Sequence, residues 1–482
     1  MSSAVPLRKE NGQASEVEQT FQLQRQEFLK NMYPSLEERL ELLGALEAMF
    51  VQYHPKVIDA LKEDCKCHPH QLTMLVEVFG TLGRIGHVRE NLAEWMKPSY
   101  RELDADVFGA SKAYVLYQPL GVVANVSPWN FPFDLTFGPL VDILAAGNRC
   151  MIKPSELSSA SSELIEEMVS ATFDKSQVAV CTGGPDLAAQ FVSQPWDHLI
   201  YTGGAEVAKK IMASAAQNLT PLTLELGGKN PTIVTEDSVN EETVHKILGT
   251  KTIKNGQLCV TADYALVPHS KLDSFISLIT KYISQQLPDF AQGEKVPGII
   301  NERHLDRLQG YVADAKKKNA KVVELNKDAN PLDRSQCQMP FTLVIEPTDD
   351  MMVMQQEVFG PILPIKTYKS IDEAIAFIND KERPLATYLF TKDEAIAEKV
   401  MKSTCSGGFA VNSAAFQAAI PSLPFGGVGA SGMGCHHGFE GFKNFSHGKG
   451  VLEAGEGGIT AAFYPPYGEL ADLVIAAALQ PK

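Results

Sequence analysis

The sequence Leu-Glu-Leu-Gly-Gly-Lys-Asn-Pro at residues 224–231 is followed, 34 residues after its glutamate, by the cysteine of Asn-Gly-Gln-Leu-Cys at residues 255–259. As a thiolate, Cys259 would attack a carbonyl carbon readily. Glu225, on a separate glycine-rich turn, could take a proton from that thiol or from a hydrolytic water. Each residue alone has an ordinary alternative, because a lone cysteine is usually a small buried hydrophobe and a glutamate before Gly-Gly is usually a turn residue. Further motifs on both sides of this pair favour catalysis.

Seven short motifs occur in order along nearly the whole chain. They are Pro128–Pro132 (PWNFP), Lys153–Glu156 (KPSE), Tyr201–Gly204 (YTGG), the two stretches above, Glu357–Pro361 (EVFGP) and Pro424–Gly429 (PFGGVG). This series resembles the aldehyde dehydrogenase superfamily. Phe445-Ser446-His447, together with residues 255–257 and 263–264, resembles the class 3 branch of that superfamily, and within the branch the bacterial coniferyl aldehyde dehydrogenases.

The resemblance implies an α/β fold with three parts, the aldehyde dehydrogenase fold. We expect a parallel-sheet, Rossmann-like cofactor-binding domain from residues 1–97 and 119–227, and an α/β catalytic domain from residues 228–412. Residues 98–118 and 413–482 are expected to form a small β oligomerisation arm and a C-terminal tail. In the family such an arm helps to build the subunit interface, so a homodimer is expected.

Local patterns favour the same arrangement. Ser35-Leu36-Glu37-Glu38 is a capping box that opens an amphipathic helix, whose apolar face carries Leu36, Leu40, Leu43, Leu46 and Phe50. From Gly121 onward, apolar strand runs alternate with helical segments, which indicates a parallel sheet with crossover helices. The expected strands are 122–126, 150–152, 178–180 and 198–201. Several of the motifs follow the carboxyl ends of these strands, where open α/β sheets bind their ligands.

Gly203 and Gly204 precede a helix expected at residues 205–216. The first turn of such a helix offers free N–H groups and a positive dipole end to a phosphate. The usual Gly-x-Gly-x-x-Gly fingerprint is missing, and Ala208 stands where the superfamily often has glycine. A purely structural turn is therefore the alternative at this position.

The resemblance also assigns roles to single residues. Cys259 is the nucleophile, Glu225 is the general base, and the Asn130 amide binds the oxyanion together with the backbone N–H of the cysteine. Lys153 and Glu156 are expected at the adenosine ribose, Glu357 at the nicotinamide ribose and Phe359 near the ring. The full cofactor set is Pro128, Trp129, Lys153, Glu156, Gly203, Gly204, Val207, Leu226, Glu357 and Phe359. The substrate set is Phe131, Leu135, Leu258, Val260 and Phe425. Surface charge and core packing are the ordinary alternatives for these positions.

Composition argues against several other classes of function. A chain of 482 residues is too long for one ordinary core, so two or three domains are expected. The formal charge of −15 argues against nucleic acid or an anionic membrane as the main partner. Residues 1–13 lack the apolar core of a secretory signal. No apolar run reaches the roughly 18 residues of a spanning helix, so a cytoplasmic protein is expected.

The cysteines suggest neither a disulfide framework nor a metal centre. Eight cysteines in a chain of this length are too sparse for the dense secreted pattern. Cys65-Lys66-Cys67-His68-Pro69-His70 is too tightly spaced for a tetrahedral zinc site and has no second ligand pair at a suitable distance. We therefore expect no metal.

The expected function is NAD-dependent oxidation of an aldehyde to its carboxylic acid, with NADP left open as a second cofactor. A carboxylate at Glu156 should repel the 2′-phosphate of NADP. The apolar substrate set favours a hydrophobic or aromatic aldehyde, with coniferaldehyde first. The alternatives are a broad aliphatic or fatty aldehyde dehydrogenase, an acylating CoA-dependent relative, and a non-enzymatic binding or structural protein on the same fold. Glu225, which could activate water, argues against the acylating CoA-dependent relative. The presence of Glu225 together with Cys259 and Asn130 argues against the non-enzymatic protein.

Overall fold

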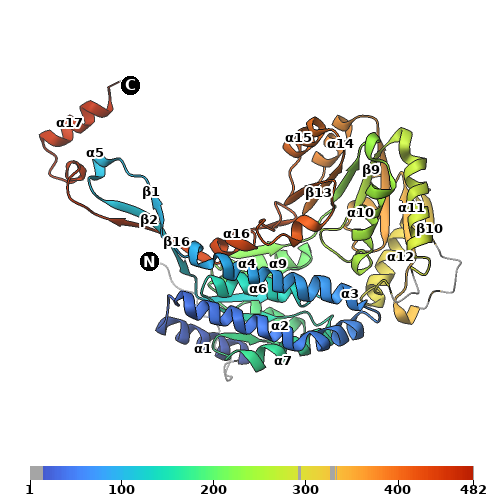
Figure 1. The fold of residues 1–482 in the computed structure, drawn as a ribbon, viewed down its shortest axis with the longest axis horizontal. Helices are drawn as coiled ribbons and strands as arrows, with labels where there is room; N and C mark the ends of the chain where they lie inside the picture. Colours follow the sequence, from blue (N-terminus) through green and yellow to red (C-terminus); the bar gives the residue numbers. More distant parts are fainter. Residues whose placement is uncertain (1–14, 291–294, 326–331, 333, 481–482) are drawn as a thin grey trace.

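Three separate sheets organise the computed structural model, which describes residues 15–290, 295–325, 332 and 334–480 (Figure 1). Two of the sheets are largely parallel and are covered by helices, as the alternating sequence pattern predicts. The third is a small antiparallel sheet that extends away from the body of the molecule (Figure 1). Among the described residues, none of the helices combines the length and the apolar composition needed to cross a membrane.

The first sheet has six strands in the order β15-β7-β6-β3-β4-β5. Its strands are β3 (Val122–Val126), β4 (Arg149–Lys153), β5 (Val178–Val180), β6 (His198–Thr202), β7 (Leu222–Glu225) and β15 (Gly432–Met433). Every neighbouring pair is parallel except β15–β7. In β3, Val123 packs into the core on one face of the sheet and Val122 into the core on the other face. This two-sided burial explains why the strand sequences are continuously apolar.

The helices around this sheet begin near the N-terminus. They are α1 (Glu16–Lys30), α2 (Leu36–Asp64), α3 (His70–Leu72), the π-helical turn η1 (Thr73–Val78), α4 (Phe79–Trp95), α6 (Asp134–Ala145), α7 (Ser159–Thr172), α8 (Pro185–Val192), α9 (Ala205–Ala215) and α16 (Gly438–Asn444). The predicted capping box is confirmed at the start of α2. There the Ser35 hydroxyl accepts the Glu38 N–H, and the Glu38 carboxylate accepts the Ser35 N–H. Leu43, Leu46 and Phe50 are buried, while Leu36 and Leu40 pack partly buried against the same core.

The second sheet has seven strands in the order β10-β11-β12-β9-β8-β13-β14. They are β8 (Pro231–Val234), β9 (Tyr264–Pro268), β10 (Lys321–Leu325), β11 (Phe341–Ile345), β12 (Ile362–Tyr368), β13 (Ala386–Phe390) and β14 (Gly408–Val411). Only β10 pairs antiparallel with its neighbour. The surrounding helices are α10 (Glu241–Thr252), α11 (Leu272–Gln286), α12 (Glu302–Lys317), α13 (Met352–Gln355), α14 (Ile371–Asn379) and α15 (Glu394–Ser403).

The third sheet is the arm. It consists of β1 (Ser99–Arg101), β2 (Lys112–Pro119) and β16 (Ser446–Glu453), all antiparallel, with the short helix α5 (Ala105–Phe108) between β1 and β2. The chain then ends in α17 (Glu469–Ala478), which lies beyond the arm (Figure 1).

Residues 413–482, predicted as arm and tail, contribute to more than the arm. Before reaching β16, the chain adds β15 to the edge of the six-stranded sheet and places Phe442 of α16 in the core of that sheet. Strand β7 would otherwise expose a row of unpaired N–H and C=O groups at a sheet edge. Within residues 413–482, the part that belongs to the arm therefore begins only at β16.

Candidate active site

A turn of unusual backbone conformation carries Cys259. After α10, the φ angles of Lys254, Asn255 and Gly256 are +51°, +57° and +74°. A Cβ atom at Gly256 would collide with the Gly360 carbonyl, so this position requires glycine. The buried Gln257 side chain holds the turn: its amide donates to the carbonyls of Lys254 (2.9 Å) and Gly298 (3.0 Å), and its oxygen accepts the Ile300 N–H (3.0 Å).

Two asparagine amides converge on the same turn. Asn130 is buried, and its Nδ2 donates to the Gln257 carbonyl at 3.1 Å. Asn230, immediately before β8, donates to the carbonyls of Cys259 (2.6 Å) and Thr261 (2.9 Å) and accepts the Ala386 N–H (2.9 Å). The structure therefore brings the PWNFP motif and the LELGGKNP motif to the cysteine.

The thiol and the carboxylate predicted as catalytic are both desolvated. Burial, followed by the charges of Glu357 and Glu225, raises the pKa of Cys259 to about 12. Burial also raises the pKa of Glu225 well above its usual 4.5. Neither carboxyl oxygen of Glu225 has a hydrogen-bond partner among the described residues. A buried carboxylate without a partner costs folding free energy, so its place at the end of β7 needs an explanation beyond packing.

Glu357 lies against the Gly-Gly turn that follows Glu225. A Cβ atom at Gly227 would collide with the Glu357 carboxylate. Burial, followed by the charge of Asp263, raises the pKa of Glu357 to about 8, while a hydrogen bond from the Gly228 N–H acts in the opposite direction. Two residues further on, Phe359 has a φ of +45° and its ring meets Trp129 edge to face at 5.5 Å.

The sequence reasoning missed a group of charged residues beside this turn. Asp263 is buried, forms an ion pair with Lys229 and accepts the Val358 N–H at 2.8 Å, so it fixes the start of the EVFGP motif. The Nζ of Lys251 is buried without a hydrogen-bond partner among the described residues, and burial lowers its pKa to about 8. A single charged residue in a helix, such as Lys251, carries no signal for this role, whereas Lys229 and Asp263 lie in stretches 224–231 and 263–264, which resemble the family.

The residues predicted for the adenosine and diphosphate parts of the cofactor lie at the ends of strands of the first sheet. At the end of β4, Lys153 is buried and donates to the Pro154 carbonyl (2.9 Å) and to the exposed Glu156 carboxylate (3.0 Å). At the end of β6, Gly203 donates its N–H to the Glu225 carbonyl at 2.9 Å. Leu226 is buried beside this point and Val207 is 49% exposed.

These residues fit a dinucleotide. Helix α9 begins at Ala205, after Gly204, without a side-chain cap, and a Cβ atom at Gly204 would meet nothing within 4 Å. The open first turn can receive a diphosphate on its N–H groups. A Cβ atom at Gly203 would collide with the Tyr201 hydroxyl, which explains the first glycine of this turn. The exposed Val207 can pack against a flat adenine ring, and Glu156 can accept from ribose hydroxyls.

The residues predicted for the substrate are apolar but differ in burial. Phe131, Leu135 and Val260 are buried, whereas Leu258 and Phe425 are partly exposed. Phe425 pairs its backbone with His436 and stacks its ring on His437 at 5.3 Å. Both imidazoles are buried, and their ring nitrogens have no hydrogen-bond partner among the described residues. Sequence reasoning did not assign these two histidines to the site.

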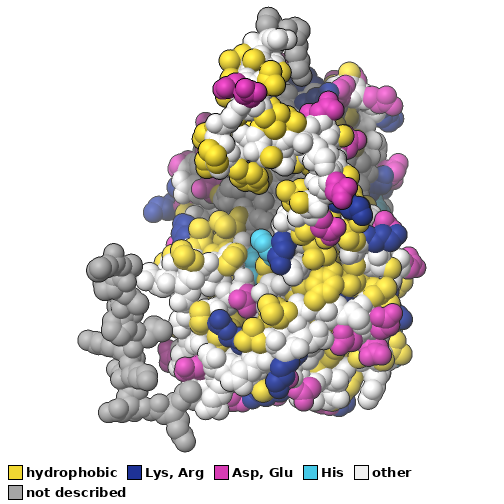
Figure 2. Space-filling model, turned by 90° about the vertical axis from the view of Figure 1, so that its left-hand side faces the viewer, with side chains coloured by type: hydrophobic (Ala, Val, Ile, Leu, Met, Phe, Trp, Pro, Cys, Tyr) yellow, Lys and Arg dark blue, Asp and Glu magenta, His cyan; other side chains and the backbone are white. Residues whose placement is uncertain are grey.

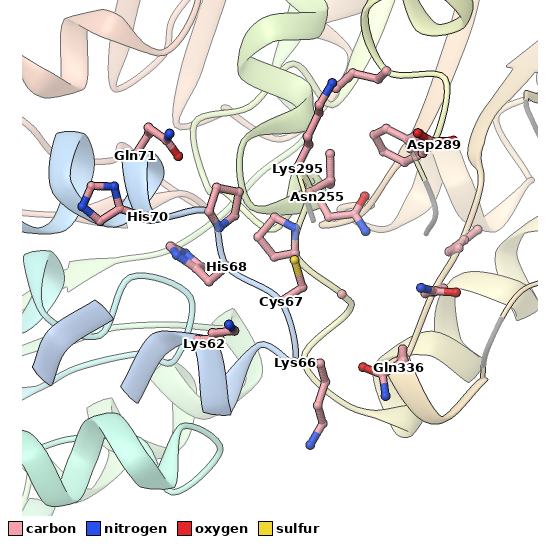
Figure 3. A pocket seen from close by; sticks show the side chains of 18 of the residues that line it. Lys62, Lys66, Cys67, His68, His70, Gln71, Asn255, Asp289, Lys295 and Gln336 are labelled. Carbon is pink, nitrogen blue, oxygen red and sulfur yellow. The ribbon is translucent and has the colours of Figure 1, made fainter. Parts of the chain in front are cut away.

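A cavity of about 830 Å³ lies elsewhere, beside Asn255. Its lining comes from the end of α2, the loop after it, and residues 287–290, 295–298 and 336–339, and it includes Cys67, His68 and Lys295 (Figure 3). None of the predicted catalytic, cofactor or substrate residues lines this cavity. In the described part of the chain, no group of three His, Cys, Asp or Glu side chains is arranged to hold a metal ion.

Comparisons with known proteins agree with this geometry. The family model described as "Aldehyde dehydrogenase family" matches residues 5–451. The chain is 42% identical to the coniferyl aldehyde dehydrogenase of a Pseudomonas species, over 90% of each chain. Its fold is similar to the substrate-bound structure of Staphylococcus aureus AldH, with a TM-score of 0.89, 32% identity and coverage of 96% of this chain and all of the other. It is also similar to PnpE from a Pseudomonas species in complex with nicotinamide adenine dinucleotide, with a TM-score of 0.82, 26% identity and coverage of 91% and 90%.

Proposed function

The chain belongs to the aldehyde dehydrogenase family and oxidises aldehydes with a nicotinamide cofactor, and from that premise we propose the residues that perform the reaction. We assign Cys259 as the nucleophile, Glu225 as the general base and Asn130 as an oxyanion donor. The observation that carries the assignment is the buried, unpartnered Glu225 carboxylate, whose charge acts on the Cys259 thiol.

In the first half of the reaction, the Cys259 sulfur adds to the aldehyde carbon and forms a thiohemiacetal. Because burial raises the pKa of this thiol to about 12, it is protonated at neutral pH and must lose its proton as it reacts. We assign Glu225, whose charge acts on this thiol, as the base that takes the proton. The Asn130 amide has two N–H groups, and only one of them is needed for the Gln257 carbonyl. The second can donate to the oxyanion, which is worth roughly 3 kcal/mol of barrier.

When a nicotinamide is bound, with Glu357 at its ribose and Phe359 near its ring, it would supply the acceptor for the hydride that leaves the substrate carbon. Cys259 is then left as a thioester, which water hydrolyses to the carboxylic acid. Glu225 takes the proton from this water, and its two unpartnered oxygens leave both lone-pair sites free for that purpose. Its raised pKa also makes it a stronger base than an exposed glutamate.

For the cofactor, we propose NAD rather than NADP. The Glu156 carboxylate is paired with Lys153 at 3.0 Å, where the adenosine ribose is expected. An added 2′-phosphate would meet this carboxylate and compete with it for Lys153.

For the substrate, we propose a hydrophobic or aromatic aldehyde, with coniferaldehyde as the leading candidate. Support comes from the Pseudomonas relative named for that activity and from the apolar substrate set. A panel of coniferaldehyde, cinnamaldehyde, hexanal, decanal, acetaldehyde and succinic semialdehyde, followed at the absorbance of NADH, tests the proposal. Cinnamyl-type aldehydes should exceed acetaldehyde in kcat/KM by about a hundredfold, given roughly 0.8 kcal/mol for each buried CH₂-sized group. Decanal ahead of coniferaldehyde would instead favour a fatty aldehyde dehydrogenase.

We also propose a homodimer built through the arm. The arm projects from the body and exposes apolar side chains, including Tyr100 at 65% and Leu452 at 58%. Hydrophobic side chains also gather on the side of the molecule from which the arm projects (Figure 2). Light scattering after size exclusion should give about twice the chain mass of 52.6 kDa. A cytoplasmic location is proposed as well, supported by the sparse cysteine content of eight residues in 482.

A further inference from the structure

The start of helix α6 is held by a buried carboxylate from a different part of the fold. Glu77 lies in the π-helical turn η1 and is fully buried. Its Oε2 accepts the N–H groups of Phe133 (3.1 Å) and Asp134 (2.9 Å). The first N–H groups of a helix have no partner within the helix, and a negative charge there is favourable. Because Phe133 follows Asn130 by three residues, Glu77 fixes the segment that carries the proposed oxyanion donor.

The other oxygen of Glu77 faces the turn that carries the nucleophile. Lys254 Nζ is 3.8 Å from Glu77 Oε1, and the lysine is almost fully buried. The same ammonium donates to His68 Nε2 at 2.8 Å, so the other ring nitrogen of His68 carries the proton and donates to the Thr73 hydroxyl at 2.9 Å. Burial lowers the pKa of His68 to about 2, which keeps this ring neutral. His68 and Asn255 both border the cavity in Figure 3.

Lys254 also holds the turn through its backbone. Its carbonyl accepts both the backbone N–H (3.1 Å) and the side-chain amide (2.9 Å) of Gln257, two residues before Cys259. With a φ of +51°, Lys254 begins the left-handed run that turns the chain toward the cysteine. A movement of its side chain would therefore be transmitted to Gln257, whose carbonyl accepts from Asn130.

A buried ion pair is weak support for stability, because desolvation of both charges offsets much of their attraction. We propose that Glu77 and Lys254 instead act as a positioning pair, which sets Asn130 and Cys259 at their working separation. The inference rests on the proposed function, since it assumes that Asn130 and Cys259 both act on the carbonyl group of the substrate aldehyde. Neither Glu77 nor Lys254 is proposed to touch the substrate.

Three variants test the pair. Glu77→Gln keeps an oxygen for the two N–H groups but removes the negative charge. Lys254→Met keeps the length of the side chain but removes the positive charge. The double variant removes both charges, so that no unpaired charge stays buried. Glu324→Gln is the matched control, since its pair with Lys316 lies on the surface of the second sheet. The readouts are kcat and KM, the Kd of NAD by fluorescence, thermal unfolding, and the number of Cys259 thiols that iodoacetamide alkylates.

We expect kcat, divided by the fraction of Cys259 that iodoacetamide alkylates, to fall by up to about a hundredfold in each single variant. A misplacement of about 1 Å between reacting groups costs a rate factor of this size. The Kd for NAD should remain near the wild-type value. The double variant should fall no further than the worse single variant, because residues that act as a unit are not additive. It also keeps the test usable if a lone buried charge prevents a single variant from folding.

Two results would overturn the pair. One is unchanged kcat per alkylatable Cys259 with a lower unfolding temperature, which would make the pair purely structural. The other is a double variant whose loss is the product of the two single losses, which would make the residues independent. Failure of the proposed function looks different, because the wild-type protein would then oxidise no aldehyde or Cys259→Ala would remain active.

Discussion

Replacing Asn230 should separate the placement of the nucleophile from the stability of the fold. The side chain is 1% exposed and makes three hydrogen bonds, to the carbonyls of Cys259 and Thr261 and from the N–H of Ala386. Each such bond contributes about 1 kcal/mol net, so Asn230→Ala should cost about 3 kcal/mol of unfolding free energy. For a domain of about 150–250 residues, the size expected for residues 228–412, that corresponds to a fall in unfolding temperature of about 6–12 °C.

The same change should slow catalysis, because two carbonyls of the nucleophile loop lose the amide that holds them. We expect kcat to fall by up to about a hundredfold and the rate of alkylation of Cys259 by iodoacetamide to change. Asn148→Ala is the matched control. This side chain is also fully buried and makes four hydrogen bonds, with Leu120, Gly121, Ile143 and Phe445, away from the cysteine.

Asn148→Ala should therefore lower the unfolding temperature by a similar amount while leaving the alkylation rate of Cys259 at the wild-type value. If both variants lose stability and neither changes kcat or the alkylation rate, Asn230 does not position the nucleophile. If Asn230→Ala loses less than about 1 kcal/mol, the free energy assigned to its three bonds is wrong.

Four further predictions follow from the site and its buried charges. Cys259→Ala should abolish aldehyde oxidation while NAD binding stays near normal. A variant that retains more than about a thousandth of the wild-type rate would contradict the assignment of Cys259 as the nucleophile. In the wild-type protein, kcat should rise with pH as Glu225 loses its proton, and Glu225→Gln should remove this rise. The same variant should accumulate an acyl adduct on Cys259, which mass spectrometry would detect. Glu156→Gln should weaken NAD binding by up to about 3 kcal/mol and narrow the preference over NADP, whereas unchanged discrimination in titrations would place Glu156 away from the ribose. Burial raises the pKa of Asp142 to about 7, so the stability that this carboxyl contributes is complete below its unfolded pKa near 3.8 and is lost as pH rises through 7. Asp142→Asn should therefore raise the unfolding temperature more at high pH than at pH 5. An equal rise at both pH values would refute the pKa shift.

Local sequence patterns were enough to locate four strands of the first sheet and two helices. The apolar runs at 122–126 and 198–201 coincide with β3 and with most of β6, and the capping box opens α2 where predicted. These features depend on side-chain periodicity and on contacts within one turn, which the sequence contains directly. The motifs also identified the family, and with it an α/β fold that contains parallel sheets.

The sequence could not show which charged residues would be buried together. Glu77 and Lys254 belong to segments far apart in the chain, and nothing near either residue indicates that they meet. The same holds for Asn230 and the carbonyls of the nucleophile loop, and for β15, whose two residues are too short to show an alternating pattern. Only the convergence of several elements decides these contacts.

By itself, the sequence determined the reaction class of this protein, because that class depends on a few residue types at fixed spacings along one chain. The tertiary structure alone decided the electrostatic state of those residues. It desolvates Cys259 and Glu225 together, leaves the carboxylate without a partner, and ties the cysteine turn to Asn130 and Asn230. The physical reason is that a pKa depends on the solvent and charges that surround a group in space, which are set by packing between distant segments.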